Sequence, residues 1–131
     1  MVTRRWRGHH EAGVGPALSI APSAGGIFNA GTLTVSGSVI TNNAAEGAGG
    51  IWNDSDATAT LKGSTVSDNR AVGGDLATRG GGIRNHGTLR LNDSTVTGNT
   101  ASIGGGIFSC GHLALKNSIV SDNTPDEVVI C

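Results

Sequence analysis

The chain has 131 residues, a length typical of one domain. It contains 22 glycines but only two Trp, two Phe and no Tyr, so any core must be narrow and built from aliphatic side chains. The glycines follow no Gly-X-Y period, which excludes collagen. The formal net charge of −1 offers no basic surplus for nucleic acid, and no apolar run approaches the roughly 18 to 20 residues needed to span a bilayer.

Residues 1–24 differ in character from the rest of the chain. Their early arginines and the small residues 21–24 resemble parts of a secretory signal, but glycines and prolines interrupt the apolar stretch between them. We therefore expect an irregular or disordered segment, or a lead-in to the first coil, and no convincing signal peptide. The adjacent His9 and His10 fall short of a metal site.

Two phrases recur four times after residue 24. The first is Gly-Gly-Ile-x-Asn, with Ser in place of Asn in the last copy, and it begins at Gly25, Gly49, Gly81 and Gly105. The second ends in asparagine and begins at Ser38, Ser64, Ser94 and Ser118. Repeats of roughly 20 to 50 residues indicate a solenoid of stacked units.

Within each copy, apolar residues alternate with polar ones, which is typical of strands. In the first copy we predict three strands near residues 26–29, 32–35 and 38–41. Equivalent strands of successive copies should pair in parallel about 4.8 Å apart and stack equivalent residues in rows. The expected interior rows are Ile27, Ile51, Ile83, Ile107; Leu33, Ala59, Leu89, Leu113; Val35, Leu61, Leu91, Leu115; and Ile40, Val66, Val96, Val120.

The recurring asparagines and glycines are interpreted as structural. The asparagines fall where the chain must turn, and stacked Asn side chains can hydrogen-bond along the axis. The expected rows are Asn43, Asn69, Asn99, Asn123 and Asn29, Asn53, Asn85, Ser109. The alternative is a polar ligand track. For the Gly-Gly pairs we expect positive φ and no room for a side chain.

These phrases resemble the right-handed parallel β-helix repeats of the pectin lyase-like superfold, above all the Gly-rich repeats of bacterial surface and secreted proteins. The resemblance spans residue 25 to about residue 126 and rests on segments such as 31–35 (Gly-Thr-Leu-Thr-Val) and 94–99 (Ser-Thr-Val-Thr-Gly-Asn). Polymorphic outer-membrane protein repeats are more distant: here Gly-Gly-Ile lacks their Ala, and Val66 stands where they have Phe. The resemblance implies an extracellular or cell-surface location and, often, adhesion.

The fold class we expect is all-β: a right-handed parallel β-helix of about four coils of roughly 24 residues, over residues 25–131. Residues 127–131 are interpreted as a fifth coil cut short, so we expect a fragment of a longer solenoid. Cys131 lies eleven residues after Val120, which would place it over Ile107 and about 10 Å from Cys110. That separation is too great for a disulfide, so free thiols are expected.

Pectin-cleaving enzymes of this superfold use clustered acidic residues. The candidates here are Asp54, Asp56, Asp68, Asp75, Asp93 and Asp122. Asp68 and Asp122 share a position, but an intervening coil has glycine there and would separate them by about 10 Å. We interpret these acids as solvated turn residues, and expect no catalytic, cofactor or metal residues.

One insertion marks the candidate ligand site. The second coil closes over seventeen residues where others need eleven, so six extra residues near 74–79 should bulge, and function tends to lie on such loops. With neighbouring cations they suggest a ligand patch of Asp75, Arg79, Arg84, His86 and Arg90. The alternative is an ordinary solvated face.

The function expected is a non-catalytic structural or adhesive module whose partner is a glycan or a host or cell-surface component. The alternative is a polysaccharide-binding or polysaccharide-degrading protein. An acidic cluster across adjacent coils would favour an enzyme, whereas aromatic or Arg rows on one sheet would favour binding.

Overall fold

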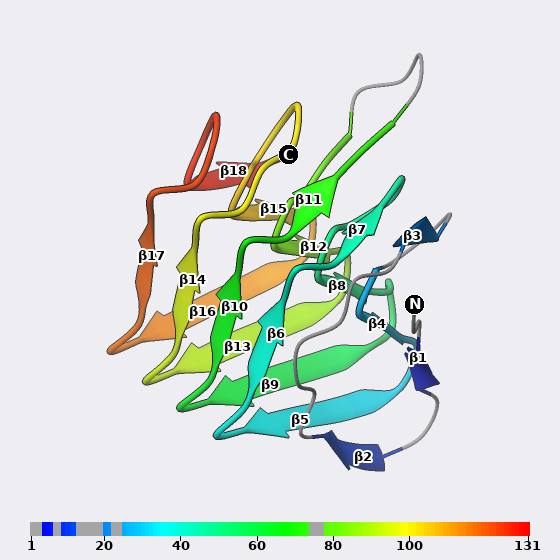
Figure 1. Cartoon of the computed structure of the whole chain (residues 1–131). Helices are drawn as coiled ribbons and strands as arrows, with labels where there is room; N and C mark the ends of the chain where they lie inside the picture. The colour runs from blue at the N-terminus through cyan, green and yellow to red at the C-terminus, as the bar shows by residue number, and fades with distance from the viewer. Residues whose placement is uncertain (1–3, 7–8, 13–19, 22–24, 74–77) are drawn as a thin grey trace.

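The computed structural model describes residues 4–6, 9–12, 20–21, 25–73 and 78–131. These residues form eighteen β-strands and no helix. Each copy of the repeat makes one turn, and the turns stack along an axis so that every strand pair is parallel (Figure 1). The predicted all-β parallel solenoid of about four turns is confirmed.

Four parallel sheets run along the solenoid. The six-stranded sheet contains β1 (Arg4–Trp6), β4 (Ile27–Asn29), β8 (Ile51–Asn53), β12 (Ile83–Asn85), β15 (Ile107–Ser109) and β18 (Val128–Ile130). The five-stranded sheet contains β2 (His9–Ala12), β5 (Thr32–Ser36), β9 (Thr58–Lys62), β13 (Thr88–Asn92) and β16 (His112–Lys116). The four-stranded sheet contains β6 (Val39–Thr41), β10 (Thr65–Ser67), β14 (Thr95–Thr97) and β17 (Ile119–Ser121). The three-stranded sheet contains β3 (Ile20–Ala21), β7 (Ala44–Ala45) and β11 (Arg70–Ala71).

The three strands predicted for the first coil are confirmed as β4, β5 and β6, but the coil has a fourth side that was not predicted. This side is the three-stranded sheet, whose two-residue strands are too short to show an alternating pattern. Parallel bridges from Arg70 to Thr100 and from Thr100 to Thr124 continue it along later coils.

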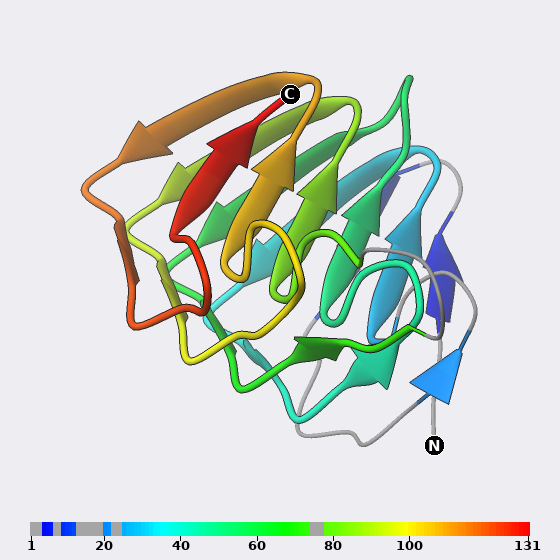
Figure 2. The same cartoon turned by 90° about the horizontal axis from the view of Figure 1, so that it is seen from above.

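The described parts of the first 24 residues extend the solenoid at one end. Strands β1, β2 and β3 pair in parallel with β4, β5 and β7. Figure 2 shows β1 and β18 at opposite edges of the six-stranded sheet, so the N-terminal and C-terminal strands mark the two ends of the stack. The remaining residues of this segment lie outside the described residues.

The four interior rows are confirmed in register. Their members in the first three coils are all fully buried, as is Ile107 in the fourth. The rest of the fourth coil is less covered: Leu113 and Val120 are partly buried and Leu115 is 47% exposed, because β16 and β17 are edge strands. Each coil therefore contributes a single layer of side chains to the core, and that layer is buried only by the layers of the neighbouring coils.

Both asparagine rows are also confirmed. In the first, the backbone N–H and Nδ2 of Asn69 donate to Oδ1 of Asn99 at 2.9 and 3.0 Å, and the same pair of bonds joins each successive coil. In the second, Nδ2 of Asn53 donates to Oδ1 of Asn85 at 2.9 Å. Apart from Oδ1 of Asn43, which is buried without a partner, the buried amides satisfy one another and the turn backbone, which is their structural role.

The described turns show where the backbone is left-handed, and one prediction is corrected. The left-handed residue is the one before each asparagine of the first row, namely Asn42, Asp68, Gly98 and Asp122. The Gly-Gly pairs do not take positive φ; Gly80 and Gly104, just before two of them, do. The lack of room at the pairs is confirmed, since a Cβ on Gly81 would lie 2.4 Å from the carbonyl oxygen of Gly105.

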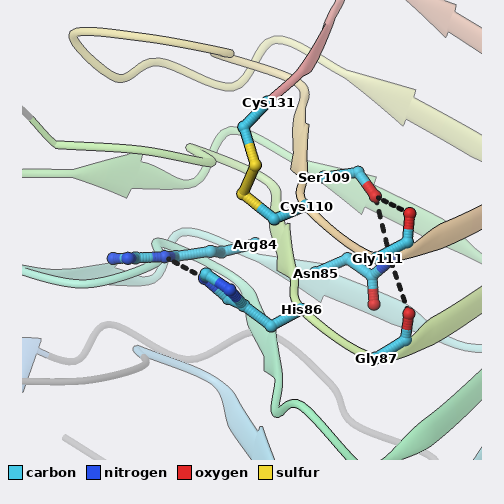
Figure 3. Close-up of a disulfide and its surroundings, with 8 residues drawn as sticks. All are labelled: Arg84, Asn85, His86, Gly87, Ser109, Cys110, Gly111 and Cys131. Carbon is cyan, nitrogen blue, oxygen red and sulfur yellow. Dashed lines mark hydrogen bonds between the residues drawn. A yellow bond between two sulfur atoms is a disulfide. The ribbon is translucent and has the colours of Figure 1, made fainter.

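The expectation of free thiols is wrong, because Cys110 and Cys131 form a disulfide with their Cα atoms 5.0 Å apart (Figure 3). The prediction assumed that eleven residues separate Val120 from the strand above Ile107. Val128, only eight residues on, pairs with Ile107 instead. Cys131 therefore stacks directly over Cys110, at the spacing of neighbouring parallel strands.

The end of the insertion packs on the next coil and does not bulge. Thr78 is buried, its Oγ1 donates to Oγ of Ser102 at 3.2 Å, and Arg79 forms a parallel bridge with Ile103. Residues 74–77 lie outside the described residues. The prediction that all six residues protrude is thus wrong for the last two, because their backbone continues the pairing between coils.

Candidate functional site

The outer surface of the six-stranded sheet carries a row of aromatic and cationic side chains. Strand residues alternate between the two faces of a sheet, so the middle residues of β4, β8, β12 and β15 lie on the outer face. Those of β4, β8 and β12 are partly exposed while their neighbours are buried, whereas that of β15 is itself buried. These residues are Phe28, Trp52, Arg84 and Phe108, in register on successive coils. We call them, together with Arg79 and His86, the aromatic–cationic face.

The members of this face contact one another along the solenoid axis. The Phe28 and Trp52 rings lie 5.8 Å apart between centroids and are tilted by 49°. The Cζ atom of Arg84 lies 4.4 Å from the Trp52 ring centroid, and that of Arg79 lies 5.5 Å from the Phe108 ring centroid. Both distances fit cation–π pairs, so the rings hold the two guanidinium groups on the face.

His86 lies in the turn after β12 and forms a hydrogen bond with Arg84. The Nε–H of Arg84 donates to Nε2 of His86 at 2.9 Å, and Figure 3 shows the two side chains next to each other. Because Nε2 accepts this bond, it carries no proton, and a neutral imidazole then has its proton on Nδ1. The His86 ring also lies 6.1 Å from the Trp52 ring, between centroids.

Burial and neighbouring charge act on both groups of this pair. Partial burial lowers the pKa of His86, the positive charge of Arg84 lowers it further, and Asp54 opposes these effects. Burial also lowers the pKa of Arg84, as does the nearby charge of Arg79. The face therefore favours a neutral imidazole beside two crowded cations.

One polar atom on the face has no partner. The indole Nε1 of Trp52 is buried and makes no hydrogen bond. A buried unsatisfied donor is rare in folded proteins and costs about 1–3 kcal/mol. Together with the guanidinium groups of Arg79 and Arg84, it leaves this face rich in donors.

The structure divides the ligand patch that the sequence suggested. Arg79, Arg84 and His86 lie together on the aromatic–cationic face. Arg90 is exposed on β13 in the five-stranded sheet, between Thr60 and Ala114 of the adjacent coils, and belongs to a different surface. Asp75 lies outside the described residues.

The aromatic members of the face were missed at the level of sequence. Phe28, Trp52 and Phe108 occupy the variable position of the Gly-Gly-Ile-x-Asn phrase, and Arg84 fills the same position in the third copy. Comparing that position across copies would have shown an outward row of three rings and one cation. The charged residues alone did not reveal this row, because Arg84 is the only one of them at the variable position.

Three of the candidate acids, Asp68, Asp93 and Asp122, are explained by turn geometry. Asp68 and Asp122 occupy the left-handed position before the asparagine row, where Asn42 and Gly98 stand in the other coils. Asp93 takes a second left-handed position that Gly37, Gly63 and Asn117 fill elsewhere. Asn, Asp and Gly are the residues that tolerate this conformation. Among the described residues, no group of three or more His, Cys, Asp or Glu side chains is placed to hold a metal ion.

The described part of the chain contains no helix that is long and apolar enough to cross a membrane. Comparisons with protein-family models, with curated proteins and with solved structures found no match to this chain. Its function must therefore be inferred from the residues of the aromatic–cationic face.

Proposed function

We propose that this chain is a non-catalytic adhesive module of a secreted or cell-surface β-solenoid protein, and that it binds polysaccharide on its aromatic–cationic face. The observation that carries the proposal is the row of Phe28, Trp52, Arg84 and Phe108 on one sheet. Ligand sites combine aromatic surface with a few placed polar groups, and this face combines both. Successive coils repeat the pattern about every 4.8 Å, which suits an extended polymer running along the axis.

The distribution of carboxylates supports a non-catalytic role. Asp68 and Asp93 lie on different turns, and each is accounted for by its left-handed backbone. Asp54 is the only acid whose charge acts on His86 in the described part of the face. Hydrolysis of a glycosidic bond by the usual route needs two facing carboxyl groups, which these positions do not supply.

The Cys110–Cys131 disulfide supports an extracellular or cell-surface location, because disulfides persist mainly in oxidising compartments. The repeat phrases support kinship with the Gly-rich bacterial surface and secreted repeats of the pectin lyase-like superfold. That kinship is part of the proposal, as is the adhesive role, because a fold hosts many functions.

The test is binding of the full chain to immobilised polysaccharides by biolayer interferometry, using dextran sulfate, alginate and dextran. Arg84→Gln should weaken binding at least about tenfold, since a charged hydrogen bond contributes roughly 1.5–3 kcal/mol. Arg90→Gln removes the same charge from the five-stranded sheet and should leave binding unchanged. Equal effects of the two substitutions, or no binding to any polymer, would contradict the proposal.

A second assay addresses the enzymatic alternative. Incubation with polygalacturonate or alginate, with and without calcium, should yield no unsaturated products and no new reducing ends. Turnover above background that disappears in Asp54→Asn would replace the adhesive module with a polysaccharide-degrading enzyme.

A further inference from the structure

We propose that His86 makes the aromatic–cationic face a pH-dependent site for acidic sugars: neutral His86 holds Arg84 against Trp52, and protonated His86 releases it. The ligand class is a saccharide that bears a carboxylate or sulfate group. This inference rests on the proposed polysaccharide-binding function and adds the ligand charge and the regulation of the site.

The hydrogen bond between Arg84 and His86 exists only while His86 is neutral. Arg84 is always a donor, so the bond requires an unprotonated Nε2 as acceptor. A protonated imidazole donates from both nitrogens and has no acceptor left. Protonation therefore replaces an attraction at 2.9 Å with repulsion between two cations, and the guanidinium must move away.

The charged groups around His86 determine what happens after protonation. Arg84 comes from β12, which leads into the turn of His86, Arg79 from the segment before that strand, and Asp54 from the turn after β8. On the following coil, Cys110 is disulfide-bonded and carries no charge. Two cations against one carboxylate leave the protonated imidazole with a net positive neighbourhood, which an anionic ligand group would neutralise.

Movement of Arg84 also changes what Trp52 presents. The guanidinium lies over the indole ring at 4.4 Å, and the indole N–H is buried without a partner. Once Arg84 leaves, a sugar can contact the ring face that the guanidinium covered. The guanidinium and imidazolium then supply two charged donors for a carboxylate or sulfate.

The sign of the pH dependence follows from linkage. The pKa of His86 is lowered in the free protein by burial and by Arg84, whereas a bound anion raises it. Between these two pKa values, binding takes up a proton, so affinity rises as the pH falls. The gain is at most about tenfold for each unit by which the anion raises the pKa.

The experiment is isothermal titration calorimetry of the full chain with dextran sulfate, alginate and neutral dextran at pH 7.5, 6.5 and 5.5. We expect affinity for both acidic polymers to rise as the pH falls, with net proton uptake measured in buffers of different ionisation enthalpy. The sulfate groups of dextran sulfate stay fully ionised over this pH range. A rise in affinity seen only with alginate would therefore reflect a property of that polymer and not the protonation of His86, and would overturn the inference.

Two variants at position 86 separate the states of the switch. His86→Gln offers Arg84 a neutral acceptor at all pH values and should give the weak, pH-independent affinity of the high-pH state. His86→Lys carries a fixed charge and should give tight, pH-independent binding. His112→Gln, an exposed histidine on the five-stranded sheet, should leave the wild-type pH profile unchanged.

The outcomes separate this inference from the function on which it rests. Binding that does not change with pH, or a pH dependence that persists in His86→Gln, overturns the role of His86 while polysaccharide binding stands. Preference for neutral dextran overturns the ligand class alone. Absence of binding to every polymer at every pH overturns both proposals together.

Discussion

Glu127 takes the place of an asparagine beside Asn123. Its carboxylate accepts hydrogen bonds from Nδ2 of Asn123 at 2.7 Å and from the backbone N–H at 3.3 Å. Asn123 itself accepts the equivalent two bonds from Asn99 in the coil before. The acidic side chain thus satisfies the last member of the row without a further coil.

Glu127→Ala should loosen this end of the solenoid. The backbone N–H of Asn123 would lose its acceptor, whereas Nδ2 would keep the carbonyl oxygens of Val96 and Ser121. Because Glu127 is exposed, we expect a loss of roughly 1 kcal/mol in the free energy of unfolding. Urea unfolding and hydrogen exchange at Asn123 are the measurements. Glu127→Gln keeps an acceptor oxygen and should retain most of the stability; if it behaves like the alanine variant, the hydrogen bonds are not the cause.

A reciprocal pair of substitutions tests the asparagine row. Asn69→Asp replaces an amide that donates to Asn99 and to the Ile40 carbonyl with a buried carboxylate, so we expect a loss of roughly 3 kcal/mol or more. Asp68→Asn makes the opposite exchange one residue earlier, on an exposed left-handed turn where Asn42 already stands in the first coil. Thermal melts followed by circular dichroism should show a large change for the first variant and almost none for the second.

The glycines differ in how much space surrounds them for a side chain. Gly81→Ala would place a Cβ 2.4 Å from the carbonyl oxygens of both Gly105 and Thr100, so two coils would have to separate. We expect a loss of at least about 3 kcal/mol, or failure to fold. Gly63→Asn meets open space and a φ of +55° that Asp93 and Asn117 already adopt at the same turn, so it should be tolerated. Similar unfolding midpoints for both variants would contradict the tight packing of the coils.

The disulfide should stabilise the last coil. Cys110 and Cys131 are 21 residues apart, and closing a loop of that length contributes about 3 kcal/mol in the chain-entropy account. We expect reductant to lower the urea midpoint of the wild type but to have no effect on a Cys110→Ser, Cys131→Ser double variant. Alkylation and mass spectrometry of the unfolded, unreduced protein should find no free thiol; two labelled cysteines would show that the bridge does not form.

The core and the two asparagine rows were predictable from sequence because they are strictly repetitive. Ile27, Ile51 and Ile83 recur at equivalent places, and parallel pairing brings equivalent residues into contact. The fourth side of the coil was not predictable, since strands of two residues such as Ala44–Ala45 leave no periodic pattern. The candidate site was only half predicted: its cations were recognised, whereas Trp52 and Phe108 were not.

By itself, the sequence determined the repeat, the pairing of the three predicted strands of each coil and the four aliphatic interior rows, because a solenoid converts local periodicity into three-dimensional register. The tertiary structure alone decided where that register breaks. The shortened last turn places Cys131 over Cys110, and one sheet brings Arg84, His86 and Trp52 together while Arg90 lies on another. These outcomes depend on turn lengths and side-chain directions, which are set by packing between coils and are not encoded in any single copy of the repeat.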